Sequence, residues 1–513
     1  MHPSYRAVLG SLCLAAFGLL AGCASLPSLQ GRAESHAIEP DESTPLGRSV
    51  ASLVRDHPGK TGVVAIDDGR LAFDTRLHLA RSAARSIDIQ TYIWYGDATG
   101  TLMFEEVARA AERGVRVRLL LDDANTVGLD PTLLLLASQP NIEVRLYNPF
   151  AARSSRGLGL LADFERLNHR MHNKSFTVDN LATVVGGRNI ADEYFEAGQE
   201  TGLVDLDVLA VGEAVRSVSA EFDLYWNSPS AYPARLLLGD GVPEERQALA
   251  RRAGEIVAAP RFGTYAAATL RTAQVSGLLE GTLALEWTTA RVVYDDPAKT
   301  LAPSSEVELQ LLPKIQAAFG NPASTLDLIS PYFVPGETGT ESLVAAARRG
   351  VRVRVLTNSL AATDVTVVHA GYAKRRPALL RGGVQLLELK PEAANIMRRA
   401  HEVGSSAKAG LHAKTYAVDG RAIFVGSFNL DPRSSKLNTE MGLIIDSPTL
   451  AGKLSRVLDQ AFPALAYRVT LGDNGSLRWA DGKTDDIEDE PGTGWLQRLL
   501  VRMASWLPGE WLL

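Results

Sequence analysis

A short pattern of polar and small residues occurs twice in this chain, and the second copy follows the first after 240 residues. In each copy a His-x-Lys triplet is followed, after four intervening residues, by Asp, and then by a small-residue pair that leads to Asn. The shared positions are His172, Lys174, Asp179, Gly186 and Asn189 in the first copy and His412, Lys414, Asp419, Gly426 and Asn429 in the second. Since any one position matches by chance roughly once in 20, this repeat indicates an internal duplication.

Each copy predicts a β-hairpin that carries its polar groups on one face. Residues two apart in a strand point the same way, so the imidazole and the ammonium of each triplet should lie side by side. Asp179-Asn180 and Asp419-Gly420 are turn dipeptides between strand-like stretches. We place Asp179 and Asp419 in the catalytic motif, although their position favours a turn role in which the carboxylate orients the strand from behind.

Two such copies facing each other would surround one tetrahedral anion with two imidazoles. A phosphodiester suits this arrangement, because one imidazole can attack phosphorus while the other protonates the departing alkoxide. The lysines would hold the non-bridging oxygens, so neither a metal nor a cofactor is required. Release of the phospho-histidine by water would make a hydrolase, and release by an alcohol a transferase. Substrate contacts are also expected from the small residues and amides at Gly187, Asn189, Ser427 and Asn429.

Two further acids stand at the start of apolar strands that follow the motifs. Glu440 precedes 442–445, and Asp205 and Asp207 precede 208–211. We expect Glu440 and Asp207 to pair with a neighbouring imidazole and raise its pKa. The alternative is that they are strand-edge charges.

These motifs resemble those of the phospholipase D superfamily, and four longer strings resemble its cardiolipin synthase C-type branch. The strings are 172–179, 186–195, 205–212 and 426–435. The resemblance implies phosphatidyl transfer through a phosphatidyl-histidine, with His172 as nucleophile and His412 as acid and base. Phosphatidylglycerol would be the substrate, with phosphatidylethanolamine as a second candidate. The rivals are a phospholipase D that releases phosphatidic acid, a nuclease-type phosphodiesterase and a non-catalytic envelope module. Because the first copy has Asp205 and Asp207 where the second has Asn438 and Glu440, its orienting acid stays open.

The repeat extends beyond the motifs into strand, helix and strand units. The segments 86–93, 102–112 and 113–120 parallel 325–333, 341–349 and 349–356. Such units predict a mostly parallel sheet with helices outside. We therefore expect an α/β fold, with two tandem phospholipase D-like α-β-α domains forming a pseudo-dimer around one shared active site. The expected divisions are a first domain at 46–227, an inserted segment at 228–300 and a second domain at 301–470.

The inserted segment contains two features of its own. Residues 244–257, after Val242-Pro243, read as a helix. Asp295-Asp296-Pro297 could suggest metal ligation, but a loop or helix-capping role is favoured.

The termini point to a membrane. An apolar stretch at 7–20 leads to Leu20-Ala21-Gly22-Cys23, which resembles a lipobox. This predicts a signal peptide at 1–22, lipidation of Cys23, a tether at 23–45 and a periplasm-facing anchor in the cell envelope, with the outer membrane favoured. An uncleaved anchor or a buried cysteine is the alternative.

At the other end, 471–513 should hold an acidic linker and an amphipathic helix. The apolar face of this helix would suit either a bilayer interface or docking on its own domain. The net charge of −6 and the pI near 5.9 disfavour a nucleic-acid partner.

Overall fold

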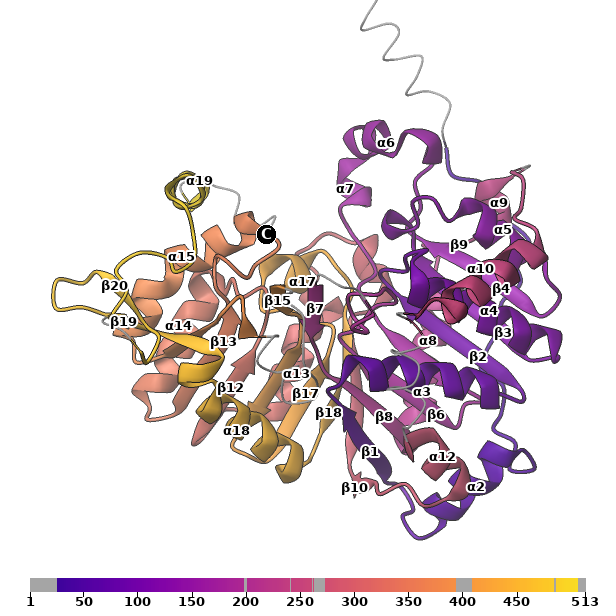
Figure 1. Cartoon of the computed structure of the whole chain (residues 1–513), viewed down its shortest axis with the longest axis horizontal. Helices are drawn as coiled ribbons and strands as arrows, with labels where there is room; N and C mark the ends of the chain where they lie inside the picture. The colour runs from indigo at the N-terminus through magenta and orange to yellow at the C-terminus, as the bar shows by residue number, and fades with distance from the viewer. Residues whose placement is uncertain are drawn as a thin grey trace, which may run out of the picture.

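The computed structural model describes residues 25–197, 201–239, 241–260, 262, 273–393, 408–483 and 486–505. Two sheets dominate this part of the chain, one in each half, with helices packed on their faces (Figure 1). The α/β class expected from the repeat is confirmed. The predicted signal peptide at 1–22 and Cys23 lie outside the described residues.

The first half is built on a nine-stranded sheet. In sheet order its strands are β10 (Glu286–Thr288), β1 (Thr61–Ile66), β8 (Asp207–Gly212), β6 (Ala182–Gly186), β5 (Ser175–Val178), β2 (Ser86–Thr91), β3 (Arg116–Asp122), β4 (Ile142–Tyr147) and β9 (Ala231–Pro233). The predicted hairpin is the pair β5 and β6, which turns at Asp179 and Asn180, both with positive φ.

The second half repeats this order in another nine-stranded sheet. Its strands are β11 (Ala290–Tyr294), β18 (Met441–Ile445), β17 (Ala422–Gly426), β16 (Lys414–Val418), β12 (Thr325–Ile329), β13 (Arg352–Asn358), β14 (Gln385–Leu389), β19 (Ala466–Leu471) and β20 (Leu477–Ala480). The run from β18 to β14 matches the run from β8 to β4, so the duplication seen in the sequence is a duplication of the sheet.

The prediction of mostly parallel sheets is wrong. In the described residues only β2–β3 and β3–β4 of the first sheet, and β12–β13 and β13–β14 of the second, are parallel. These are the strands joined through crossover helices. The remaining neighbours include the motif hairpins, which a two-residue turn can join only in antiparallel fashion.

Helices cover both sheets. In the first half they are α2 (Pro45–Arg55), α3 (Gly69–Ser82), α4 (Ala98–Glu112), α5 (Asp130–Ser138), α6 (Arg156–Ala162), α7 (Phe164–Leu167) and α8 (Glu213–Asn227). The segment between the halves adds α9 (Ala234–Leu238), α10 (Arg246–Ala258) and α12 (Ala273–Glu280). In the second half they are α13 (Leu311–Phe319), α14 (Gly336–Arg348), α15 (Thr366–Arg381), α17 (Pro432–Lys436), α18 (Pro448–Ala464) and α19 (Trp495–Ser505).

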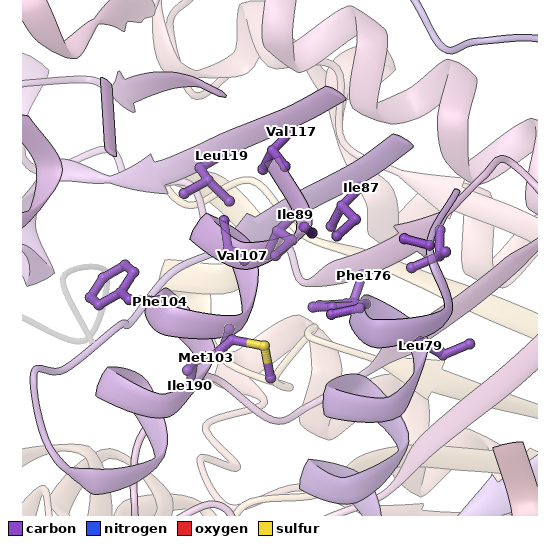
Figure 2. Packing of buried hydrophobic residues seen from close by; sticks show 14 of the residues in the cluster. Leu79, Ile87, Ile89, Met103, Phe104, Val107, Val117, Leu119, Phe176 and Ile190 are labelled. Carbon is purple, nitrogen blue, oxygen red and sulfur yellow. The ribbon is translucent and has the colours of Figure 1, made fainter. Parts of the chain in front are cut away.

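The core of the first half shows how the crossover unit is held. Met103, Phe104 and Val107 of α4 are buried with Ile87 and Ile89 of β2, as Figure 2 shows. Side chains at i, i+1 and i+4 of the helix and at alternate positions of the strand meet in one layer. Apolar burial of this kind fixes β2, and β2 in turn carries the hairpin of the first motif through its pairing with β5.

The segment at 228–300 contributes to both sheets. It supplies β9 and β10 at the two edges of the first sheet and β11 at an edge of the second. Asp296 accepts a hydrogen bond from Ala298 N (2.8 Å) and caps the short helix Pro297–Thr300. The capping role is therefore confirmed. Within the described ranges no cluster of three or more His, Cys, Asp or Glu side chains could hold a metal ion.

The described helices include none that combines the length and apolar character needed to cross a bilayer.

The boundary between the two halves, called the seam below, contains a small parallel strand pair. It joins β7 (Thr201–Val204) of the first half to β15 (Lys408–Leu411) of the second.

Candidate active site

Both motifs lie at the seam between the halves, and each is held by hydrogen bonds to the backbone of the opposite half. His172 N donates to Thr439 O (2.8 Å), and Thr439 N donates back to Arg170 O (2.9 Å). In the other copy, His412 N donates to Val204 O (2.8 Å). Each triplet therefore lies beside the residue that precedes the other half's acid.

This exchange places each acid against the histidine of the other half. His172 Nδ1 lies 2.8 Å from Glu440 Oε2, and His412 Nδ1 lies 2.6 Å from Asp205 Oδ2. A carboxylate on Nδ1 orients the ring and leaves Nε2 as the nitrogen that can react. The two imidazoles thus have equivalent supports, drawn from opposite halves.

The expectation that Asp207 supports an imidazole is wrong. Asp207 Oδ2 lies 2.9 Å from Arg76 Nη2 and 3.4 Å from Arg188 Nη1, inside the first half. Strand register gives the reason: Gly186 pairs with Asp207 and Gly426 pairs with Gly442, so Asp207 corresponds to Gly442. Counting back two residues from each makes Asp205 the counterpart of Glu440.

The expectation that the small residues after each hairpin contact substrate through their backbone amides is wrong. Gly187 N donates to Leu206 O (3.2 Å) and Ser427 N to Met441 O (2.9 Å), so both amides are used in strand pairing. A Cβ on Gly187 would lie 2.2 Å from Asp205 Oδ1. Ser427 Oγ donates to Glu440 Oε2. The residues at 187 and 427 therefore accommodate and orient the acids.

Asp179 and Asp419 lie at the turn end of each hairpin, away from the histidines. The Asp179 carboxylate accepts hydrogen bonds from the backbone N–H groups of Ala84, Arg85 and Ser86 (3.0, 2.7 and 2.9 Å). Asp419 accepts from those of residues 323–325 in the same way (3.1, 2.7 and 3.0 Å). Their place in the catalytic set is thus corrected to a structural one, since each ties its turn to the start of β2 or β12.

The motif lysines and asparagines are the predicted site residues that keep polar groups available for a substrate. Lys174 Nζ donates to His172 O (2.6 Å), and Lys414 Nζ donates to His412 O. Asn189 Nδ2 and Asn429 Oδ1 are buried without a hydrogen-bond partner among the described residues. Asn189 Nδ2 is a donor, and because an unpaired buried polar atom is costly, it is suited to an oxygen atom of a ligand. Asn429 Oδ1 is an acceptor and is suited to a hydroxyl group of a ligand.

Two tyrosines that the sequence did not single out wall the imidazoles. Tyr92 meets the His172 ring edge-on (4.9 Å, 70°), and Tyr194 meets the His412 ring similarly (5.0 Å, 78°). Both tyrosines come from the first half and occupy unrelated positions relative to the motifs. No repeat in the sequence could have revealed them.

Burial sets the charge state of the basic groups. It lowers the pKa of Lys174 to about 7, of Lys414 to about 8 and of His412 to about 4, and it lowers that of His172 well below its usual value. The positive charges of the lysines lower both histidine pKa values further. Asp205 opposes the fall at His412, but the pKa of both imidazoles is lowered, so the expected rise is wrong. A bound anion would oppose these shifts, because it stabilises the charged forms.

The two acids differ from each other. Burial disfavours ionisation of Asp205, but the charges of His412 and Lys414 outweigh burial and lower its pKa to about 2. Burial raises the pKa of Glu440 to about 7, against the opposing charge of Lys174. Asp205 is thus an anion beside its histidine, whereas Glu440 changes its protonation state near neutral pH.

The family described as "Cardiolipin synthase, PLD-like domain" matches residues 77–226 and 315–462. Cardiolipin synthase C of Escherichia coli (strain K12) is 45% identical over 480 residues, covering 91% of this chain and 99% of the relative. An uncharacterized protein of Helicobacter pylori (strain ATCC 700392 / 26695) is 32% identical over 451 residues, covering 83% and 85%.

Among solved structures, the phosphatidylserine synthase of Haemophilus influenzae Rd KW20 is similar in fold. Its TM-score is 0.58 at 15% identity, with 92% of this chain and 100% of that chain covered.

Proposed function

Since the chain belongs to the phospholipase D superfamily, in its cardiolipin synthase branch, we propose that it makes cardiolipin by moving a phosphatidyl group from one phospholipid to another. The observation that carries this proposal is the pair of imidazoles at the seam, each oriented through Nδ1 by the other half's acid. The similarity to Cardiolipin synthase C extends over 99% of that protein, which supports a common reaction.

In the first step, His172 Nε2 attacks the phosphorus of the donor lipid, and the P–O bond to the head-group alcohol breaks. His412 gives its proton to the departing alkoxide. The product is a phosphatidyl group on His172, and the released alcohol is glycerol when the donor is phosphatidylglycerol.

In the second step, the acceptor's hydroxyl gives its proton to the now neutral His412. The resulting alkoxide attacks phosphorus and displaces His172. Two phosphatidylglycerol molecules thus become one cardiolipin and one glycerol. Phosphatidylethanolamine is a second candidate substrate.

The assignment of roles follows from the difference between the acids. A nucleophilic imidazole must be neutral, and His172 has a strongly lowered pKa beside Glu440, whose own pKa burial raises to about 7. A general acid must carry a proton, and the ionised Asp205 stabilises an imidazolium at His412. The phosphodiester charge adds to this stabilisation when substrate binds. Lys174, Lys414 and the two asparagines are proposed to hold the non-bridging oxygens.

We also propose the domain divisions and the location of the protein. The domains would be 46–227 and 301–470, with 228–300 between them, and the chain would be held in the envelope through a lipid on Cys23. Mass spectrometry of the N-terminal peptide of the mature protein tests the anchor. A diacylglyceryl group on Cys23 supports it, and an unmodified cysteine in a longer peptide contradicts it.

The reaction itself is tested by incubating the full-length protein with phosphatidylglycerol vesicles. We expect cardiolipin and glycerol in equal amounts. Phosphatidic acid without cardiolipin would mean that water is the acceptor and that the protein is a phospholipase D.

A further inference from the structure

Helix α19 exposes most of its apolar side chains. It rests on the second half through Val501, which is 5% exposed and packs with Leu360 and Ala370. The exposed large apolar side chains of this helix are Trp495, Leu496, Leu499, Leu500 and Met503, with fractions of 43–71%. One narrow face is thus docked on the domain while a wider apolar face is open to solvent. Contiguous exposure of this kind marks an interaction surface.

The first half carries a second apolar surface, on α6 and α7. Its large exposed apolar residues are Leu158, Leu160, Leu161 and Phe164, with fractions of 37–75%. No described residue of α6 is buried, so packing in the core does not explain its leucines.

Both surfaces rise from the same edge of the molecule, whereas α18 lies at the opposite edge (Figure 1). Each surface lies a few residues and hydrogen bonds away from one of the two motif histidines. Helix α7 ends at Leu167, and Arg433 of the second half donates to Asn168 Oδ1 and O, both at 2.8 Å, four residues before His172.

The path from α19 leads to the other histidine. Gln497 Nε2 donates to Leu360 O (3.2 Å). Two residues earlier, Asn358 exchanges hydrogen bonds with Leu411 (2.9 and 3.1 Å), the neighbour of His412. The two apolar surfaces therefore flank the seam that holds the site.

We propose that α6–α7 and α19 are two docking surfaces, one from each half, that insert into the interface of a phospholipid bilayer and hold the seam over the lipid head groups. This inference rests on the proposed function, since a lipid substrate must enter the seam from a bilayer. A second copy of the chain on the same edge would instead close that route.

The chemistry of α19 matches this occupant. Its eleven described residues include Arg498 and Arg502 and no acidic residue. Arg498 is paired with Asp489 (3.4 Å), and Arg502 is exposed, where its charge complements anionic head groups. Tryptophan beside leucine and methionine suits the boundary between head groups and acyl chains. The eleven described residues are too few to span a bilayer but enough to lie in the interface.

Local insertion is the decisive measurement, because a lipid anchor elsewhere would also bring the protein to vesicles. The full-length chain with His172→Ala, Cys13→Ser and Cys23→Ser has no native thiol and no nucleophile. A nitroxide is attached at Leu161→Cys, Met503→Cys or Val457→Cys. Val457 is the control, since it is 45% exposed and belongs to α18, the helix at the opposite edge in Figure 1. Oxygen and nickel-complex accessibilities are measured with vesicles of phosphatidylcholine and phosphatidylglycerol.

We expect labels at 161 and 503 to gain oxygen and lose nickel accessibility when vesicles are added, and the label at 457 to stay unchanged. Entry of only one of the two labels, or of neither, overturns the two-surface proposal. Spin–spin broadening at 503 without vesicles would assign the surface to a second copy and also overturn it. None of these outcomes depends on catalysis, so they can be separated from failure of the proposed reaction.

A rate measurement gives the functional counterpart. For Leu499→Glu with Met503→Glu, the ratio of the rate on long-chain vesicles to the rate on dispersed short-chain phosphatidylglycerol should fall about tenfold or more, because apolar contact is lost and charge is added. Val457→Glu should leave the ratio unchanged. An unchanged ratio in the double variant contradicts the proposal.

Discussion

The first half-site pairs His172 with Glu440, and the second pairs His412 with Asp205, so one scaffold supports its two imidazoles with different acids. Arg188 of the first half is among the charges that lower the pKa of Asp205, and it also donates to Asp205 O (2.8 Å). Near Glu440 the corresponding cation is Lys299, whose charge also lowers the Glu440 pKa, but Lys299 Nζ is paired with the buried carboxylate of Asp295 (2.9 Å). The Glu440 backbone N–H donates to that same carboxylate (2.8 Å). The surroundings of the two acids thus turn a symmetric fold into an asymmetric pair.

This difference teaches how a duplicated site can divide its labour. A neutral imidazole next to an acid of raised pKa is suited to attack, and an imidazole next to a fixed anion is suited to carry a proton. Because each acid comes from the opposite half, neither half-site is complete alone.

The largest expected effect separates attack from proton transfer. His172→Ala should lower turnover of phosphatidylglycerol by about 10⁴-fold or more, and His412→Ala by a similar factor. With a p-nitrophenyl phosphodiester, whose leaving group needs no proton, the His412→Ala loss in the first step should shrink to about tenfold or less. The His172→Ala loss should remain. Burst kinetics of p-nitrophenol release measure this, and equal losses for both variants would remove the distinction.

The acids should differ in the same direction. Asp205→Asn should lower kcat by about 10²-fold, because the imidazolium loses its anion. Glu440→Gln should lower it by about tenfold, because burial raises the pKa of that acid to about 7 and so already reduces its negative charge. Steady-state kinetics with phosphatidylglycerol compare the two. A larger loss for Glu440→Gln would assign the general acid to His172.

The lysines should determine how kcat/KM depends on pH. Burial lowers the pKa of Lys174 to about 7, so its ammonium is present below that pH and is lost as the pH rises through it. We therefore expect kcat/KM, which reports the free enzyme, to fall above about pH 7. Lys174→Arg keeps the charge and should move this limb upward, toward the titration of Lys414 near 8. An alkaline limb that does not move would show that another group sets it.

The smallest effect concerns the turns. Asp179→Ala should lower the free energy of unfolding by about 2–3 kcal/mol, because it leaves several N–H groups beside a buried turn unpaired. Asp419 is more exposed, and Asp419→Ala should cost about 1 kcal/mol. Denaturant unfolding measures both, with Asp→Asn as the control that still tolerates positive φ. Equal costs would contradict the difference in burial.

The sequence predicts well whatever is local. The turn dipeptides at 179–180 and 419–420, the hairpins and the crossover helices follow from spacing and periodicity within short segments. The sequence alone did not predict the exchange of acids, because the contact between residues 172 and 440 depends on how two sheets pack. The choice of Asp207 over Asp205 failed for a related reason: the register of β8 against β6 decides which acid lies at the seam. The backbone N–H groups of residues 187 and 427 cannot contact a substrate, because the neighbouring strands accept their hydrogen bonds.

The central claim is that His172 alone carries the phosphatidyl group. The most direct test mixes the full-length protein with phosphatidylglycerol, quenches it in alkaline denaturant to preserve the P–N bond, and maps the modified peptide by mass spectrometry. The account predicts an adduct on His172 that accumulates in His412→Asn and is absent from His172→Ala. An adduct on His412, or turnover that persists in His172→Ala, would contradict it.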